Sequence, residues 1–270
     1  MKKIGAARRI GVVTEKEYLT PHLIRVKLKV DDIHEFQHAT PGNNNKILVP
    51  PPGVKEIHFP EIDPETGKAL PIPDHLASSR RTYTHSGIDI EQSELFIDFV
   101  AHGEEGPASA WAINCQKGDV LGIMMKTGPK ELFPEVENML FVGDATALPA
   151  IAAMVRQLPE NVSATCVLEV FGKEDELELP SPANIAVHWL HNPNPQKGSE
   201  LAQKVRGLLL PQESRFVFIA AEFDTVKDLR GYFRKELEWG REEISAYSYW
   251  RAGVAEDRSE KDRRAEKASM

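Results

Sequence analysis

The chain has 270 residues, a length that is long for one domain and suits two. Hydrophobic residues make up 41% and charged residues 27%, the balance of a soluble globular protein, and no apolar run reaches the roughly 20 residues that cross a bilayer. The formal net charge of −8 argues against a nucleic-acid partner, and two cysteines are too few for an iron–sulfur cluster, which needs about four thiolates, so redox chemistry would need an organic cofactor.

The N-terminal segment predicts no export signal. Residues 1–9 are basic, but no apolar stretch follows them. We therefore expect a cytoplasmic protein without a membrane span.

The first half of the chain is typical of short strands separated by turns. Residues 24–30 alternate apolar and basic, which is the period of a half-buried strand, and residues 95–101 form a second candidate. Shorter runs lie at 10–13, 46–49, 82–84 and 120–125. A set of about six short strands predicts an antiparallel β-barrel.

Prolines concentrate between two of these strands, in residues 50–73. Proline cannot donate to a strand ladder, so this density predicts an irregular surface loop. Residues 64–67, with the sequence Pro-Glu-Thr-Gly, predict a turn within the loop.

The second half alternates predicted strands and helices. A short apolar strand at 139–142 precedes a helical pattern that runs to about residue 158. Further strands are predicted at 164–171, 185–190 and 216–220, and helices at 198–209 and 224–237. Strands that alternate with helices predict a parallel α/β sheet of the nucleotide-binding kind.

The predicted organisation is therefore a two-domain β plus α/β protein. The antiparallel barrel occupies residues 1–134, the α/β domain residues 135–253, and a charged tail residues 254–270. Residues 256–267 hold five acidic and five basic side chains. An exposed helix and a disordered segment are both compatible with that composition.

Arg81, Tyr83 and Thr84 form the first segment with chemical potential. A guanidinium can pair with a pyrophosphate, an aromatic ring can lie against a flavin, and a hydroxyl can bond a ring nitrogen. Strand alternation places Arg81 and Tyr83 on one face, and Thr82 and Thr84 on the other. The alternative is an ordinary strand with a surface arginine.

Residues 102–109 form the second segment, directly after a predicted strand. Gly103 and Gly106 permit a tight turn, and Pro107 suits the first turn of a helix, whose backbone N–H groups can hold a phosphate. Glu104 and Glu105 have the wrong charge for that role, so we expect them to point outward. The alternative is a plain strand–turn–helix link.

Two further segments lie in the second half. Gly143 and Asp144 end a strand at the point where α/β proteins bind nucleotides, without the G-x-G-x-x-G pattern, and Thr146 is predicted to cap the next helix. Trp250 and Arg251, close to the C-terminus, suit either core packing or a lid on a planar cofactor.

Taken in chain order, the four segments resemble the siderophore-interacting protein family, the flavin-dependent ferric-siderophore reductases of the ferredoxin-reductase-like superfamily. The resemblance runs from about residue 9 to residue 253. One departure is Ser86, where relatives often carry an arginine, and another is the run of three asparagines at 43–45. The matching stretches are Arg81-x-Tyr83-Thr84, His102-Gly103-x-x-Gly106-Pro107-Ala108-Ser109, Gly143-Asp144-x-Thr146-Ala147-Leu148-Pro149-Ala150, and Tyr249-Trp250-Arg251-x-Gly253.

The resemblance implies that the barrel binds FAD and that the α/β domain receives the electron donor. It also implies that basic residues attract an anionic ferric siderophore, and that electrons pass through FAD with no catalytic side chain and no protein-bound metal. The implied cofactor-binding residues are Arg81, Tyr83, Thr84, His102, Gly103, Gly106, Pro107, Ala108, Ser109, Gly143, Asp144, Thr146 and Trp250, and the implied substrate-binding residues are Lys46, Lys130 and Arg251.

The implied activity is reduction of an Fe(III)-siderophore, which releases Fe(II) for iron acquisition. The alternatives are a general NAD(P)H-dependent flavin or quinone reductase, a ferredoxin-linked electron-transfer flavoprotein, and a siderophore-binding module without activity. NADH, NADPH and ferredoxin stay open as donors, and the acidic residues of 172–176 favour NADH. We expect a monomer whose partners are the ferric siderophore and, in one alternative, a ferredoxin.

Overall fold

The structure is a computed structural model that describes residues 5–254, so the tail expected at 254–270 lies outside the described residues except for Val254. The chain divides into two compact units, Met1–Lys130 and Glu131–Met270. No helix within residues 5–254 is long and apolar enough to span a bilayer. The two cysteines, Cys115 and Cys166, are free and buried.

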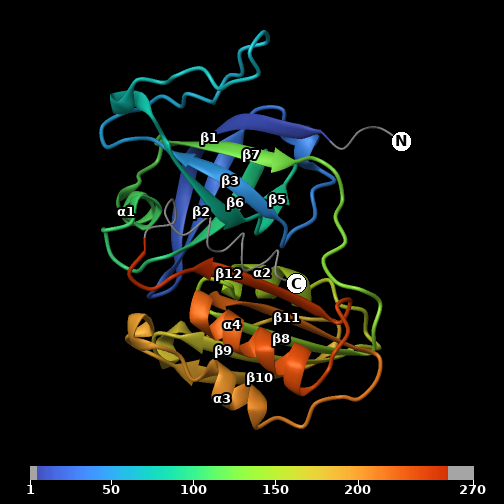
Figure 1. Cartoon of the computed structure of the whole chain (residues 1–270). Coiled ribbons are helices and arrows are strands. Elements are labelled where there is room, and N and C mark those ends of the chain that lie inside the picture. Colours follow the sequence, from blue (N-terminus) through green and yellow to red (C-terminus); the bar gives the residue numbers. More distant parts are fainter. Residues whose placement is uncertain (1–4, 255–270) are drawn as a thin grey trace. The chain divides into compact units, whose positions relative to one another are not determined.

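The first unit is built on an antiparallel sheet (Figure 1). Its strands are β1 (Ala6–Thr20), β2 (Leu23–Val30), β3 (Asn44–Val49), β4 (Ser79–Thr84), β5 (Gly87–Asp89), β6 (Glu94–Val100) and β7 (Val120–Lys126). They pair in the order β4-β3-β7-β1-β2-β6-β5. The sheet therefore has seven strands where the sequence predicted about six, because β5 is too short to show a hydrophobic period.

Alternation along β2 determines which face of the sheet becomes the core. Val26 and Leu28 are fully buried, whereas Arg25 lies on the other face beside Asp98 of β6. The Arg25 guanidinium donates to both Asp98 oxygens at 2.8 Å, which satisfies a carboxylate that is 5% exposed. The pairing of β2 with β6 thus matches charge on one face and apolar surface on the other.

The sheet curls until strands that are distant in its order meet. Tyr83 of β4 and Phe99 of β6 have ring centroids 4.6 Å apart, although four strands separate β4 from β6 in the sheet order. Phe99 also packs on Trp111, at 5.6 Å, in helix α1 (Pro107–Asn114). These contacts curl the sheet around a single core, which confirms the predicted antiparallel barrel.

The proline-rich loop at 50–73 has little regular structure, as predicted. Its tip is organised by Asp63, whose carboxylate accepts the N–H groups of Glu65 and Thr66 at 2.8 and 3.0 Å. These hydrogen bonds make the expected turn, because an aspartate side chain can substitute for a backbone acceptor.

The second unit is a parallel sheet with helices (Figure 1). Its strands are β8 (Asn138–Asp144), β9 (Ser163–Val170), β10 (Asn184–His191), β11 (Arg215–Glu222) and β12 (Ile244–Trp250), and its helices are α2 (Leu148–Val155), α3 (Leu201–Arg206) and α4 (Phe223–Gly231). The strand order is β10-β9-β8-β11-β12. The chain moves outward from β8 in one direction and then in the other, so the switch point lies between β8 and β11.

Three predicted elements of this unit differ from the observed ones. The helix expected at 198–209 is reduced to α3, because Gly198 has a φ of 112°, outside the helical range. The helix expected at 224–237 is α4 followed by a π-helical turn at Tyr232–Glu236. Strand β12 was predicted only as an aromatic segment, since its serines interrupt the apolar pattern.

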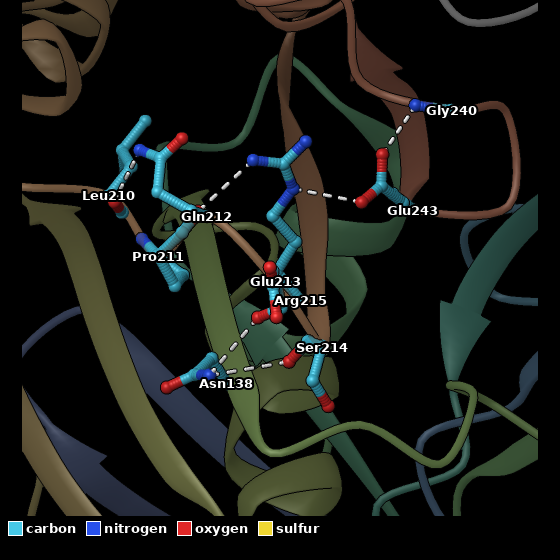
Figure 2. A network of polar contacts seen from close by, with 9 residues as sticks. All are labelled: Asn138, Leu210, Pro211, Gln212, Glu213, Ser214, Arg215, Gly240 and Glu243. Atoms are coloured by element: carbon cyan, nitrogen blue, oxygen red, sulfur yellow. Dashed lines mark hydrogen bonds and ion pairs between the residues drawn. The ribbon is translucent and has the colours of Figure 1, made fainter.

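A polar network anchors the amino end of β11 (Figure 2). The Arg215 Nε donates to Glu243 Oε1 at 2.8 Å, its Nη1 donates to the Pro211 carbonyl at 3.2 Å, and its guanidinium lies 4.3 Å from the centroid of the Trp239 ring. Arg215 holds the pKa of the Glu243 carboxyl below its usual value. The network thereby ties β11 to the segment that leads into β12.

We expect Arg215→Ala to lower the free energy of unfolding by about 2 kcal/mol, because a charge-assisted hydrogen bond and a cation–π contact are lost together. Urea unfolding measures the change. Arg206→Ala is the matched control: Arg206 also pairs with a carboxylate and stacks on Tyr232, but its side chain is 33% exposed against 15% for Arg215. The Arg206 variant should lose less than half as much, and equal losses would contradict the assignment.

Candidate functional site

The candidate flavin-binding strand is β4, at the edge of the first sheet. Arg81 and Tyr83 are half-buried, and Thr82 on the opposite face is exposed. Thr84 shares the face of Thr82 by alternation but is 7% exposed, so it is enclosed at the end of the strand. The ring of Tyr83 is supported from behind by Phe99.

The loop between β6 and α1 contains Gly103 and Gly106, and Ser109 makes hydrogen bonds across it. Gly103 has a φ of 100°, and a Cβ there would meet no described atom within 4 Å. The Ser109 hydroxyl accepts the His102 N–H at 3.1 Å and donates to the Gly103 carbonyl at 2.6 Å. Glu104 and Glu105 are exposed, as expected.

Helix α1 begins at Pro107, with Gly106 as its N-cap residue. Among residues 5–254, this end has no side-chain cap hydrogen bond. An uncapped helix start beside a glycine turn suits a phosphate, and a supported aromatic ring beside an arginine suits a flavin. The residues of β4 and the 102–109 loop therefore fit FAD.

Buried polar side chains gather beside Tyr83, and the sequence did not predict them as a group. Asn45 pairs with Tyr83 in the register of β3 and β4, and His85 and Ser86 follow β4 directly. Asn45 and His85 are 1% and 0% exposed, and neither their side-chain nitrogens and oxygens nor the Ser86 hydroxyl has a hydrogen-bond partner within residues 5–254. Burial lowers the pKa of His85 to about 4. Such atoms call for water or a ligand.

The three basic residues implied for the substrate lie in different units. Lys46 on β3 donates to the hydroxyl of Thr82 on β4, and the Lys130 ammonium donates at 3.3 Å to Oδ1 of Asn43, the residue before β3, so both lysines belong to the first unit. Arg251 belongs to the second unit, where its guanidinium lies 4.7 Å from the centroid of the Phe223 ring.

In the second unit, Gly143 and Asp144 end β8 at the switch point. A Cβ on Gly143 would lie 2.7 Å from both the Ala147 Cβ and the Ile151 Cδ1, so the glycine lets α2 pack closely on the sheet. Asp144 is 6% exposed, and its desolvation raises the pKa of the carboxyl. The Trp250 indole Nε1 donates to Asp144 Oδ2 at 2.7 Å.

The predicted capping role of Thr146 was wrong. The N-cap residue of α2 is Ala147, and no side chain of the described residues caps this helix. The Thr146 hydroxyl instead donates to Asp144 Oδ1 at 2.5 Å, and its backbone N–H donates to the same oxygen at 2.9 Å. The Thr146 donors bond to the buried Asp144 carboxylate because it is a stronger acceptor than water or a carbonyl.

Glu222 is the last residue of β11, and its carboxylate accepts backbone hydrogen bonds there. Its Oε2 accepts the N–H groups of Asp224 and Thr225 at 2.6 and 3.4 Å, which caps α4. Its Oε1 accepts the Ala252 N–H at 3.1 Å. The segment after β12 is thereby held to the carboxyl edge of the sheet.

A curled antiparallel sheet with an Arg-x-Tyr-Thr edge strand, followed by a parallel α/β unit, defines a flavin-reductase type of oxidoreductase. The comparisons narrow this class. The family model for the siderophore-interacting FAD-binding domain matches residues 12–130, and that for the siderophore-interacting protein matches residues 136–253. The chain belongs to the siderophore-interacting protein family.

Individual relatives match more than nine-tenths of the chain. The ferric vibriobactin reductase ViuB of Vibrio cholerae is 30% identical over 250 residues, which cover 92% of this chain and 91% of ViuB. The siderophore-interacting protein SipS from Aeromonas hydrophila has a TM-score of 0.81 at 29% identity, covering 96% of this chain and 97% of SipS. A siderophore utilization protein from T. fusca also has a TM-score of 0.81, at 28% identity, covering 93% of this chain and 95% of its own.

Proposed function

We propose that this protein is an FAD-dependent oxidoreductase that reduces Fe(III) held by a siderophore and so releases Fe(II). The observation that carries the proposal is the match of both halves of the chain to the siderophore-interacting family, the first half to its FAD-binding domain. FAD, when bound, supplies the electron transfer. Fe(III) is harder and more highly charged than Fe(II), so reduction weakens its complex with hard oxygen ligands.

The side chains of the first unit bind and orient the cofactor. Arg81 would pair with the pyrophosphate of FAD, the Tyr83 ring would contact the flavin, and Thr84 would offer a hydroxyl at the end of the strand. The start of α1, after Gly106, adds backbone donors for phosphate. No acid or base is required on the iron side, because the reaction moves electrons only.

Lys46 and Lys130 give the acidic protein a local basic surface. The chain carries a net charge of −8, so an anionic chelate needs a site whose local potential opposes the global one. Lys46 and Lys130 supply this charge in the first unit, and Arg251 is the candidate substrate-binding residue of the second unit. The donor is a pyridine nucleotide or a ferredoxin, and the protein acts as a cytoplasmic monomer.

The test is iron release under anaerobic conditions. FAD-loaded protein is mixed with a ferric siderophore, NADH or NADPH, and a chromogenic Fe(II) chelator. We expect the flavin to bleach on addition of the donor and to recover its colour as Fe(II) appears. Release of no Fe(II) with any physiological donor, from a protein whose flavin does bleach, would rule the activity out in favour of a reductase of free flavins or quinones.

We expect Lys46→Ala and Lys130→Ala each to raise KM for an anionic ferric siderophore by roughly 3- to 10-fold, because each removes about 1 kcal/mol of charge attraction. The effect should shrink as salt rises and should vanish with an uncharged chelate. Lys117→Ala, at an exposed lysine outside the proposed surface, is the matched control. A change in kcat alone, insensitive to salt, would contradict the substrate-binding role.

A further inference from the structure

The carboxyl edge of the second sheet is where an α/β unit ordinarily holds the phosphates of a nucleotide. Ligands bind there at the switch point, here between β8 and β11, and backbone N–H groups supply the donors. The state of those donors therefore determines what this edge can bind.

In this protein the donors of the switch point are already used by Asp144. Its Oδ1 accepts the N–H and the hydroxyl of Thr146, at 2.9 and 2.5 Å. Its Oδ2 accepts the Glu222 N–H at 2.9 Å and the Trp250 Nε1–H at 2.7 Å. A buried carboxylate thus receives four hydrogen bonds: two from Thr146 ahead of α2, one from the end of β11 and one from the end of β12.

The first turn of α2 offers few further backbone N–H donors to a phosphate. The Ala147 N–H donates to the Asp144 carbonyl at 2.9 Å, and the Leu148 N–H to the Ala145 carbonyl at 3.4 Å. Pro149 has no N–H, and Leu148 and Ala150 are 2% and 1% exposed. A phosphate outside the sheet cannot reach this helix start as it reaches that of a dinucleotide-binding fold.

The two strands beside β8 also carry buried carboxylates at or near their carboxyl ends. Glu222 accepts three backbone N–H groups at the end of β11. Glu169 on β9, 4% exposed and beside Asp144 in the register, accepts the Ser199 hydroxyl at 2.9 Å and the Glu200 N–H at 3.2 Å. Three adjacent strands therefore present carboxylates where a phosphate site would present donors.

We propose that the Asp144 carboxylate is a built-in replacement for a ligand anion at this edge, so that a pyridine nucleotide donor is recognised through its dihydronicotinamide end and gains little from its pyrophosphate. The inference rests on the proposed function, which requires a donor. It makes Asp144 a specificity-determining residue that acts through the donors it occupies.

Binding of ADP-ribose tests the inference without any electron transfer, since this molecule carries the pyrophosphate but no nicotinamide. Titrated calorimetrically into the FAD-loaded protein, it should show no saturation below roughly 5 mM. A dissociation constant in the micromolar range would overturn the inference.

Asp144→Ala vacates the anion position and should create the missing site. We expect inorganic pyrophosphate to raise the melting temperature of this variant by several degrees, and to leave the wild type and Val142→Ala unchanged at matched ionic strength. Val142 is a buried neighbour on β8 whose truncation destabilises without freeing a donor. An equal shift in all three proteins, or none in a folded Asp144→Ala, would overturn the inference.

Donor kinetics decide the question even if Asp144→Ala does not fold. NADH and reduced nicotinamide mononucleotide share the reacting ring, so their kcat/KM values for bleaching the flavin should agree within about tenfold. A larger preference for NADH, or no bleaching by either, would overturn the inference. Iron release from dithionite-reduced protein stays as a separate readout, so failure here and failure of the proposed function can be told apart.

Discussion

Arg81→Ala is expected to purify almost colourless, with a dissociation constant for FAD raised by about 100-fold. Loss of a guanidinium from a phosphate contact removes charge-assisted hydrogen bonds worth about 3 kcal/mol, and this corresponds to about two decades in Kd. Reconstitution with FAD, followed by quenching of flavin fluorescence, measures the change.

Arg80 provides the matched control on the same strand. Arg80 is exposed on the opposite face of β4, and its carbonyl accepts a hydrogen bond from Arg81 Nη1 at 2.8 Å, which an alanine would still accept. Arg80→Ala should therefore bind FAD within about twofold of the wild type. Equal losses in the two variants would mean that the general charge of the strand, and not the position of Arg81, holds the cofactor.

His85 is expected to make the first unit sensitive to acid. Its pKa falls from 6.5 to about 4 because burial disfavours the imidazolium. Between these two values the unfolded chain binds a proton that the folded chain does not, so stability falls as pH falls through this window. The full contribution lost between pH 6.5 and 4 is about 3 kcal/mol.

His85→Leu should remove this part of the pH dependence, because leucine has no group that can gain a proton. Urea unfolding of the full chain at pH 7 and pH 4.5 measures the difference. His38→Gln, at an exposed histidine, should retain the acid sensitivity of the wild type. If His85→Leu loses as much stability at pH 4.5 as the wild type, other groups govern the acid response.

The buried polar group around His85 depends on strand pairing that the sequence pattern does not reveal. In the sequence, the three asparagines at 43–45 are unusual and Ser86 departs from the family pattern, but no sequence pattern connects these residues with one another. The register of β3 with β4 places Asn45 opposite Tyr83, and the curl of the sheet buries the group. Period-2 alternation carried the only available signal, since Asn45 lies on the same face as Ile47.

Local sequence patterns correctly predicted elements whose stability is mostly local. The alternation of β2, the apolar run of β8 and the Pro107 start of α1 each depend on neighbours within a few residues. The motif order also predicted the family, which the two family models confirm. Strands β5 and β12 escaped because partner strands, and not their own periodicity, stabilise them.

Composition, hydrophobic periodicity and motif order were enough to predict an acidic chain with an antiparallel barrel, a parallel α/β unit and the motifs of a flavin-dependent family, and with too few cysteines for an iron–sulfur cluster of its own. The hydrogen bonds of Asp144 and Thr146, in contrast, depend on the three-dimensional fold. Thr146 looks like a helix cap by spacing, yet it donates to Asp144, which also receives Glu222 and Trp250 from 78 and 106 residues away. A buried carboxylate takes the strongest donors that the fold brings to it, and the fold, unlike the local spacing, determines which donors are near.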